Sequence, residues 1–328
     1  MTAGRRGIAL TPMETRLDVV VRMAELADEL GYEIFAVPEG WGLDSTVVLA
    51  EIAMHTRRLK LAAGVLSIWG RSAATIAMSA ATLQRLSGGR FVLGLGASTR
   101  QLVERFHGVG YVQPAERLRQ VASTVRALLA GERAGGVPGS RPLRLGLPAA
   151  PHVPMWIAAT GPRTVRTAAE LADGWYPLFL TRERCRTWAA ELGVVRDGAG
   201  LHDRPLTVAT GPLAVADQEV GDARTVAAAC TAWYLTAMGG GYARLVSEQG
   251  YAEVADVVVA NPRPSPQAGV VPESAQVLLD ELTAYGPPAR VRERLEPWDS
   301  AADIVMVGLP PGSPWPCLEA TIRAAAVR

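Results

Sequence analysis

The feature that most constrains the fold of this 328-residue chain is a regular alternation of short apolar runs with longer stretches of helical periodicity. Most of the short runs are nearly continuously apolar, which is typical of parallel strands covered on both faces. Eight such strands are predicted, at residues 6–10, 34–37, 59–66, 91–95, 155–159, 174–178, 206–210 and 304–307.

Eight strands that alternate with helices predict an α/β fold, the (β/α)8 or TIM barrel, as a single domain over residues 1–328. A doubly wound open sheet is the alternative, but no GxGxxG pattern opens the first helix. The segment between the seventh and eighth strands is too long for one crossover. We therefore expect an insertion at about residues 222–282, either over the barrel mouth or as a peripheral helical addition.

The turn after the fifth predicted strand is a candidate phosphate site. Gly161 ends the strand, and Pro162 suits the first turn of a helix, where its missing N–H costs no hydrogen bond. Thr160 adds a hydroxyl and Arg163 a guanidinium to the free N–H groups of this helix start, which attract anions. The alternative is a plain strand-to-helix turn in which glycine only ends the strand and proline only begins the helix.

The active site of such a barrel lies at the C-terminal ends of its strands, and the residues there are aromatic, rich in glycine and poor in charge. This mouth suits a large planar ligand. Glu39, beside Trp41, is a candidate proton donor or acceptor, or else a solvated loop acid. Trp41 and Trp175 are candidate walls of the site, or packing at the rim. His107 is a weaker second candidate for proton transfer. The alternative is a histidine that only packs within a loop.

Composition excludes several classes of function. The net charge of +1 argues against nucleic acid as the main partner. The three cysteines and four histidines are scattered without metal-ligand spacing, so we expect neither a metal site nor a disulfide framework. No apolar run has the length of a membrane span or of a signal peptide. We expect a cytoplasmic protein that acts on a small-molecule substrate, without membrane or nucleic-acid partners.

Several segments, taken together and in order, resemble the luciferase-like flavin and deazaflavin oxidoreductases, and most of all the branch that uses coenzyme F420, similar to methylenetetrahydromethanopterin reductase. The segments are VPEGWGLDS (37–45), RLKLAAGVLSIWGRSAATIAMSAATLQRLSGGRFVLGLGAS (58–98), FHGVGYVQPAERLRQ (106–120), AATGPRTVRTAAELADGWYPLF (158–179) and GPPARVRERL (286–295). The resemblance implies a (β/α)8 barrel with an insertion, coenzyme F420 in the barrel mouth, and a homodimer.

The resemblance also implies roles for particular residues. The cofactor phosphate is expected at the turn from Thr160 to Thr164, which agrees with the helix-start argument. A non-proline cis peptide bond is expected behind the ring system, between Gly64 and Val65. Glu39 is expected as the proton relay, at a position near which many relatives have histidine. The segment near the cofactor's linker is expected at Gly96, Ala97 and Ser98.

The implied reaction is hydride transfer between the reduced deazaflavin and an unsaturated or carbonyl-containing small molecule. Two alternatives stay open. One is an FMN-dependent monooxygenase that is supplied by a separate reductase. The other is a barrel without redox activity that binds a ligand or catalyses a redox-neutral step.

Overall fold

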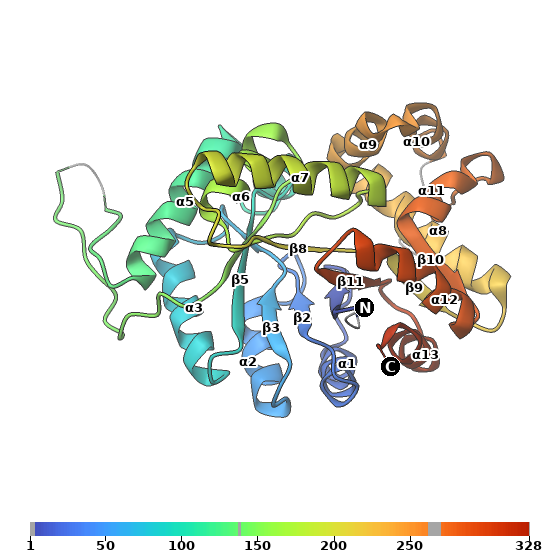
Figure 1. Ribbon diagram of the computed structural model, residues 1–328, viewed down its shortest axis with the longest axis horizontal. Helices are drawn as coiled ribbons and strands as arrows, with labels where there is room; N and C mark the ends of the chain where they lie inside the picture. The colour runs from blue at the N-terminus through green and yellow to red at the C-terminus, as the bar shows by residue number, and fades with distance from the viewer. Residues whose placement is uncertain (1–3, 137–138, 262–269, 328) are drawn as a thin grey trace.

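Eight short apolar strands pair side by side in parallel, and the last pairs with the first, so the sheet closes into a ring (Figure 1). The closing pair joins residues 6–10 to residues 305–309. This computed structural model describes residues 4–136, 139–261 and 270–327. The strands of the ring are β1 (Arg6–Leu10), β2 (Ile34–Val37), β3 (Lys60–Ala63), β5 (Phe91–Gly96), β6 (Met155–Ala158), β7 (Gly174–Trp175), β8 (Thr207–Thr210) and β11 (Ile304–Leu309). The predicted (β/α)8 barrel is confirmed.

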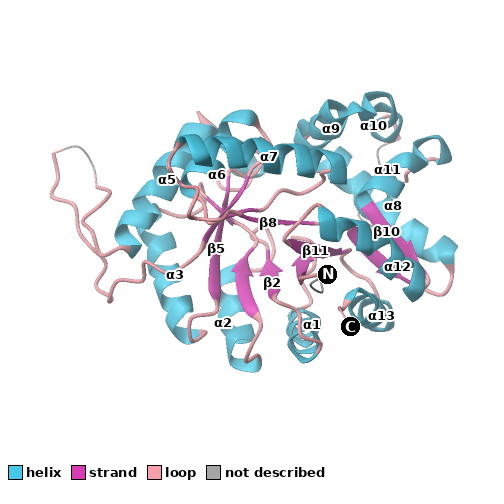
Figure 2. Cartoon of the chain, viewed as in Figure 1, coloured by secondary structure: helices cyan, strands magenta, loops and turns pink. Residues whose placement is uncertain are grey.

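Helices cover the outside of the ring (Figure 2). In the first of them, Val20, Met23, Ala24 and Ala27 are buried at helical spacing and form the stripe that packs on the strands. The covering helices are α1 (Leu17–Glu29), α2 (Ser45–His55), α3 (Ala73–Leu86), α5 (Pro114–Leu129), α6 (Pro162–Leu171), α7 (Arg182–Gly198), α12 (Pro288–Leu295) and α13 (Trp315–Ala325), and the short helix α4 (Arg100–Arg105) lies in the connection from β5 to α5.

The inside of the ring has its own small core. Alanines from several strands line it, and the large side chains of Trp156 and Met306 fill the space that these alanines leave. Tyr176 packs against this inner core and lies 5.9 Å from Trp156 between ring centroids. The barrel is therefore packed inside, and a ligand has to bind at its mouth.

The predicted insertion lies between β8 and β11, at the right of Figure 1. It extends beyond the predicted bounds of 222–282 on both sides, where it contains two short strands that the sequence analysis missed because each is only four residues long. They pair in parallel, and Leu213 at the start of β9 pairs with Gly308 of the barrel. Residues 262–269 of the predicted insertion lie outside the described residues. The elements are β9 (Leu213–Ala216), α8 (Val220–Ala237), α9 (Gly240–Val246), α10 (Ala252–Val259), α11 (Gln276–Leu282) and β10 (Thr283–Gly286).

In the described part of the chain, no helix combines the length and the apolar character needed to cross a bilayer.

Candidate active site

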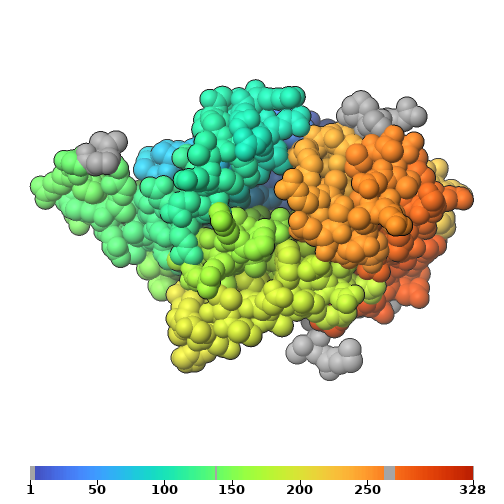
Figure 3. All heavy atoms as spheres, turned by 90° about the horizontal axis from the view of Figure 1, so that it is seen from above, coloured from blue at the N-terminus to red at the C-terminus, as the bar shows by residue number. Residues whose placement is uncertain are grey.

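The C-terminal ends of the strands surround a hollow. Figure 3 looks onto this end and shows the hollow between the teal, yellow-green and orange parts of the chain. The orange part is the helical insertion, and the yellow-green part contains α6 and its preceding turn. The insertion therefore borders the barrel mouth, as one of the two predicted arrangements requires.

The predicted phosphate turn has the geometry of a helix start. Gly161 is the N-cap of α6, with extended backbone (φ −103°), and Pro162 is the first helical residue. The Thr164 hydroxyl accepts from the Gly161 N–H at 3.3 Å and donates to the Gly161 carbonyl at 2.9 Å. As first-turn residues, Arg163 and Thr164 have no intrahelical acceptor for their N–H groups. The exposed Arg163 side chain forms no ion pair with another described residue. The turn thus offers unpaired donors and one free positive charge.

The loop after β5 lies next to this turn, because Gly96 and Ala158 are partners in adjacent strands. The Ala97 carbonyl accepts from the Trp69 indole at 2.8 Å, and the Ser98 carbonyl accepts from the Tyr111 hydroxyl at 3.2 Å. Ser98 has a left-handed backbone (φ 57°). Because both carbonyls accept hydrogen bonds from side chains of other segments, the loop is fixed beside the phosphate turn.

The third strand is interrupted between β3 and β4 (Leu66–Ser67), and the peptide bond between Gly64 and Val65 is cis, as the resemblance implies. Two glycines of β5 leave room for this segment. A Cβ on Gly94 would lie 2.1 Å from the Ala63 carbonyl oxygen, and a Cβ on Gly96 would lie 2.6 Å from a Val65 methyl group. Gly96 therefore makes space for the bulge, in addition to its predicted place near the cofactor's linker.

Glu39 lies at the mouth, and its side chain is bonded to charged and polar groups. One carboxylate oxygen accepts from the Arg71 guanidinium at 2.9 and 2.7 Å, and the other accepts from the Ser67 N–H at 3.0 Å. Arg71 also pairs with Asp44 at 2.8 Å. Burial lowers the pKa of Arg71, the bonds to the two carboxylates raise it, and the net shift is upward. In this arrangement Glu39 holds Arg71 in place, and its role as proton relay stays a prediction.

Trp175 does not face the mouth. Its ring is fully buried, its indole donates to the Ala159 carbonyl at 2.9 Å, and it packs against Trp188 of α7 at 6.1 Å. The next residue, Tyr176, points inward instead, because successive side chains of a strand alternate between its two faces. A Cβ on Gly64 would lie 3.3 Å from the Tyr176 ring. Tyr176 therefore lies at the floor of the mouth, whereas Trp175, which was expected as a wall of the site, is buried behind it.

His107 packs against the loop that precedes Arg71. A Cβ on Gly70 would lie 2.9 Å from its imidazole ring. The ring also makes an edge contact with Phe106 at 5.2 Å, and its buried Nε2 has no hydrogen-bond partner among the described residues. These contacts are those of a packed loop histidine, and nothing in the described structure joins it to Glu39.

An aromatic wall joins the barrel to the insertion. Trp41 lies 5.8 Å from Trp233 of α8, and the adjacent Tyr234 lies 4.9 Å from Phe179, which follows β7. Tyr242 of α9 contacts both Phe179 and Tyr234, at 5.4 and 5.3 Å. We call these five residues the aromatic wall. They pack Trp41 against side chains that the sequence analysis did not select, and its role as a wall of the site stays a prediction.

A sequence signal for the missed wall residues existed. Trp233 and Tyr234 are adjacent aromatic residues in a helix whose residues 227–235 are all buried. A helix that is apolar on every face must be covered on every face. Most of this cover comes from the other elements of the insertion, and the contact with Trp41 adds the barrel rim.

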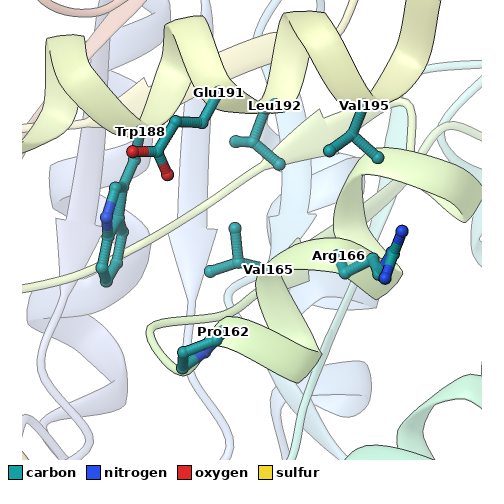
Figure 4. A pocket seen from close by; sticks show the side chains of 7 residues that line it. All are labelled: Pro162, Val165, Arg166, Trp188, Glu191, Leu192 and Val195. Carbon is teal, nitrogen blue, oxygen red and sulfur yellow. The ribbon is translucent and has the colours of Figure 1, made fainter. Parts of the chain in front are cut away.

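A second cavity lies on the outside of the barrel, between α6 and α7 (Figure 4). Its volume is about 290 Å³. Val165 faces Leu192 and Val195 across it. This cavity is in the layer of covering helices, outside the ring of strands, so we assign the chemistry to the mouth. The residues that line it are Pro162, Val165, Arg166, Trp188, Glu191, Leu192 and Val195.

No group of three or more histidine, cysteine, aspartate or glutamate side chains within the described ranges is placed to hold a metal ion. The donors at the mouth are instead backbone N–H groups, hydroxyls and guanidinium groups. These suit the anionic part of an organic ligand.

Comparisons with known proteins bear on the family and the fold of this chain. A family model described as luciferase-like monooxygenase matches residues 1–303. A Mycobacterium tuberculosis protein, whose name assigns it provisionally to the coenzyme F420-dependent oxidoreductases, is 29% identical over 317 residues, which are 86% of this chain and 87% of that protein.

Two solved structures share the fold. The coenzyme F420-dependent tetrahydromethanopterin reductase of Methanopyrus kandleri superposes with a TM-score of 0.81 at 20% identity, over 99% of this chain and 98% of its own. The oxygenating constituent of the 3,6-diketocamphane monooxygenase of Pseudomonas putida, in complex with FMN, has a TM-score of 0.71 at 15% identity, over 99% and 98%. The matched fold and the family model covering most of the chain lead to one conclusion: this protein belongs to the luciferase-like monooxygenase family.

Proposed function

We propose that the protein is an oxidoreductase that uses coenzyme F420 to reduce, or to form, an unsaturated or carbonyl-containing small molecule. The observation that carries the proposal is the start of α6, where free N–H groups and the unpaired Arg163 lie beside the loop of Gly96 at the barrel mouth. Such a turn suits the phosphate of a cofactor. The Mycobacterium tuberculosis relative supports the deazaflavin as that cofactor.

The residues of the mouth fit a tricyclic ring attached to an anionic chain. The phosphate turn and Arg163 would hold the anionic part. The bulge at Gly64 and the floor residue Tyr176 would lie under the ring system. The aromatic wall would shield the ring system from water. A bound deazaflavin supplies hydride transfer at its ring, while the protein contributes binding, orientation and exclusion of water.

The ion pair of Glu39 and Arg71 would position the rim of the site. Both carboxylate oxygens of Glu39 accept hydrogen bonds, so the loop after β2 is tied to the loop after β4. Arg71 donates two hydrogen bonds to one carboxylate oxygen of Glu39, while the other oxygen accepts only the Ser67 N–H and keeps a second lone pair. We therefore propose that Glu39 acts first by holding Arg71, and that a proton relay would use the oxygen bonded to Ser67.

Titration of the purified protein with oxidised coenzyme F420 and, separately, with FMN tests the proposal. We expect saturable binding of F420 in the micromolar range, measured by the change in cofactor fluorescence. We expect FMN to bind at least tenfold more weakly. Tighter binding of FMN would favour the two-component monooxygenase. If neither cofactor binds at micromolar concentration, the ligand-binding or redox-neutral alternative replaces the proposal.

We also propose that the protein is a homodimer that forms through α2 and α3. These adjacent helices expose Val47, Met54 and Met78, with 65%, 74% and 55% of each residue accessible. Replacing both methionines with glutamate should yield a monomer in light scattering, because the charged side chains would have to be desolvated in the interface. Val194→Glu, at an equally exposed position on α7, should leave the dimer intact. A monomeric wild type, or a dimeric double variant, contradicts this interface.

A further inference from the structure

Three tyrosines gather where the barrel floor meets the insertion. Tyr176 comes from the end of β7, Tyr234 from α8 and Tyr242 from α9. Burial raises the pKa of each phenol, to about 12 for Tyr242. For Tyr176 and Tyr234, repulsion from neighbouring ionisable groups raises the pKa further, and these groups include other phenols of the set. The rings of Tyr234 and Tyr242 lie 5.3 Å apart between centroids, and all three phenols remain protonated at neutral pH. We call them the tyrosine cluster.

The hydroxyls of the tyrosine cluster form no hydrogen bond to any other described residue. Other buried tyrosines of this protein do have partners: the Tyr32 hydroxyl donates to the Ile322 carbonyl at 2.6 Å, and the Tyr285 hydroxyl accepts from Gln276 at 2.9 Å. Buried polar groups in folded proteins are normally hydrogen-bonded. Tyr234 is only 3% exposed, and its hydroxyl, which has no partner among the described residues, still reaches solvent and is free to donate to a ligand.

The surroundings of these hydroxyls are otherwise apolar. Tyr234 and Tyr242 belong to the aromatic wall, which carries no charged side chain, and Cys230 lies one helical turn before Tyr234. The positive charge of Arg71 at the mouth is already paired with two carboxylates, those of Glu39 and Asp44. Arg163 belongs to the phosphate turn. A substrate carboxylate or phosphate at the wall would therefore be buried without a cation, which is unfavourable.

We propose that the tyrosine cluster binds the oxygen of an uncharged aromatic or cyclic carbonyl compound, whose carbon skeleton lies against the aromatic wall. This inference rests on the proposed function of the same site and narrows its substrate class. The hydroxyls act as hydrogen-bond donors that fix the orientation of the carbonyl group. They are positioning groups for a substrate, and the phosphate turn, which follows the neighbouring strand β6, remains assigned to the cofactor.

Three molecules of nearly the same shape test the proposal: acetophenone, α-methylstyrene, in which a CH2 group replaces the carbonyl oxygen, and benzoate, which adds a charge. Their dissociation constants are measured by ligand-observed NMR at neutral pH, with and without saturating oxidised coenzyme F420. We expect acetophenone to bind roughly fivefold more tightly than α-methylstyrene, the net value of one hydrogen bond, and benzoate to bind more weakly than either.

The same titrations on Tyr234→Phe and Tyr242→Phe should remove the preference for acetophenone while leaving the affinity for α-methylstyrene unchanged. Tyr285→Phe, which loses a hydroxyl at the base of the insertion, is the matched control and should keep the preference. Thermal unfolding shows that each variant is folded. Equal binding of acetophenone and α-methylstyrene to the wild type, tight binding of benzoate, or a preference that survives in both phenylalanine variants would overturn the inference.

Failure of this inference and failure of the proposed function give different results. If F420 binds but the carbonyl preference is absent, the cofactor assignment stands and the substrate class is wrong. If the carbonyl preference is present but F420 does not bind, the tyrosine cluster recognises its ligand without the proposed cofactor.

Discussion

Replacing Gly161 with aspartate should abolish binding of the phosphorylated cofactor and leave the fold as stable as before. A Cβ at this position would lie 3.7 Å from the Thr164 hydroxyl, an ordinary contact, and aspartate is a preferred N-cap residue. The new carboxylate would lie where the phosphate is expected, and two like charges about 4 Å apart repel by several kcal/mol at a protein surface. We therefore expect the dissociation constant of coenzyme F420 to rise about 100-fold or more.

Gly161→Asn is the matched control for this prediction. Asparagine has the size of aspartate and caps helices equally well, but it carries no charge. It should retain most of the cofactor affinity, and both variants should unfold at or above the wild-type temperature. Unchanged F420 binding by Gly161→Asp in a fluorescence titration would show that the anion binds elsewhere.

Gly94→Ala should destabilise the protein by about 3 kcal/mol, near the upper end of the usual cost of overpacking a core. The added Cβ would lie 2.1 Å from the Ala63 carbonyl oxygen and 2.7 Å from a Val65 methyl group. The nearer atom belongs to the backbone of the adjacent strand, so no rotamer change relieves the clash. Urea unfolding followed by circular dichroism measures the loss.

Gly193→Ala makes the same chemical change at a helix position of α7 where an added Cβ meets no atom within 4 Å. Alanine is the better helix former, so this variant should be stabilised by up to about 1 kcal/mol. If Gly94→Ala unfolds at the same urea concentration as the wild type, the tight contact between β3 and β5 is not a constraint in solution.

The barrel could be predicted from the sequence because its signals are local. A buried parallel strand needs a continuous apolar run, and a covering helix needs an apolar stripe at helical spacing, and both are visible within a few residues. The turn at Gly161 and Pro162 is local in the same sense, since proline and glycine restrict or extend the backbone whatever surrounds them. The observed helix indeed begins at Pro162.

The partners of the site residues were not predictable in this way. Glu39 and Arg71 are distant in sequence, and the ion pair between them depends on where two loops meet. Trp175 and Tyr176 are adjacent and similar, and only the register of β7 decides that the first enters the outer core and the second the barrel floor. One residue of register exchanges the two faces of a strand.

The sequence by itself determined the order of strands and helices, the barrel they form and the helix start that suits an anion, because these follow from short-range apolar patterning and backbone preference. The tertiary structure alone decided that α8 and α9 bring Trp233, Tyr234 and Tyr242 against Trp41 and Phe179. Contacts between an insertion and a barrel rim depend on long-range packing, which leaves no periodic pattern in the chain.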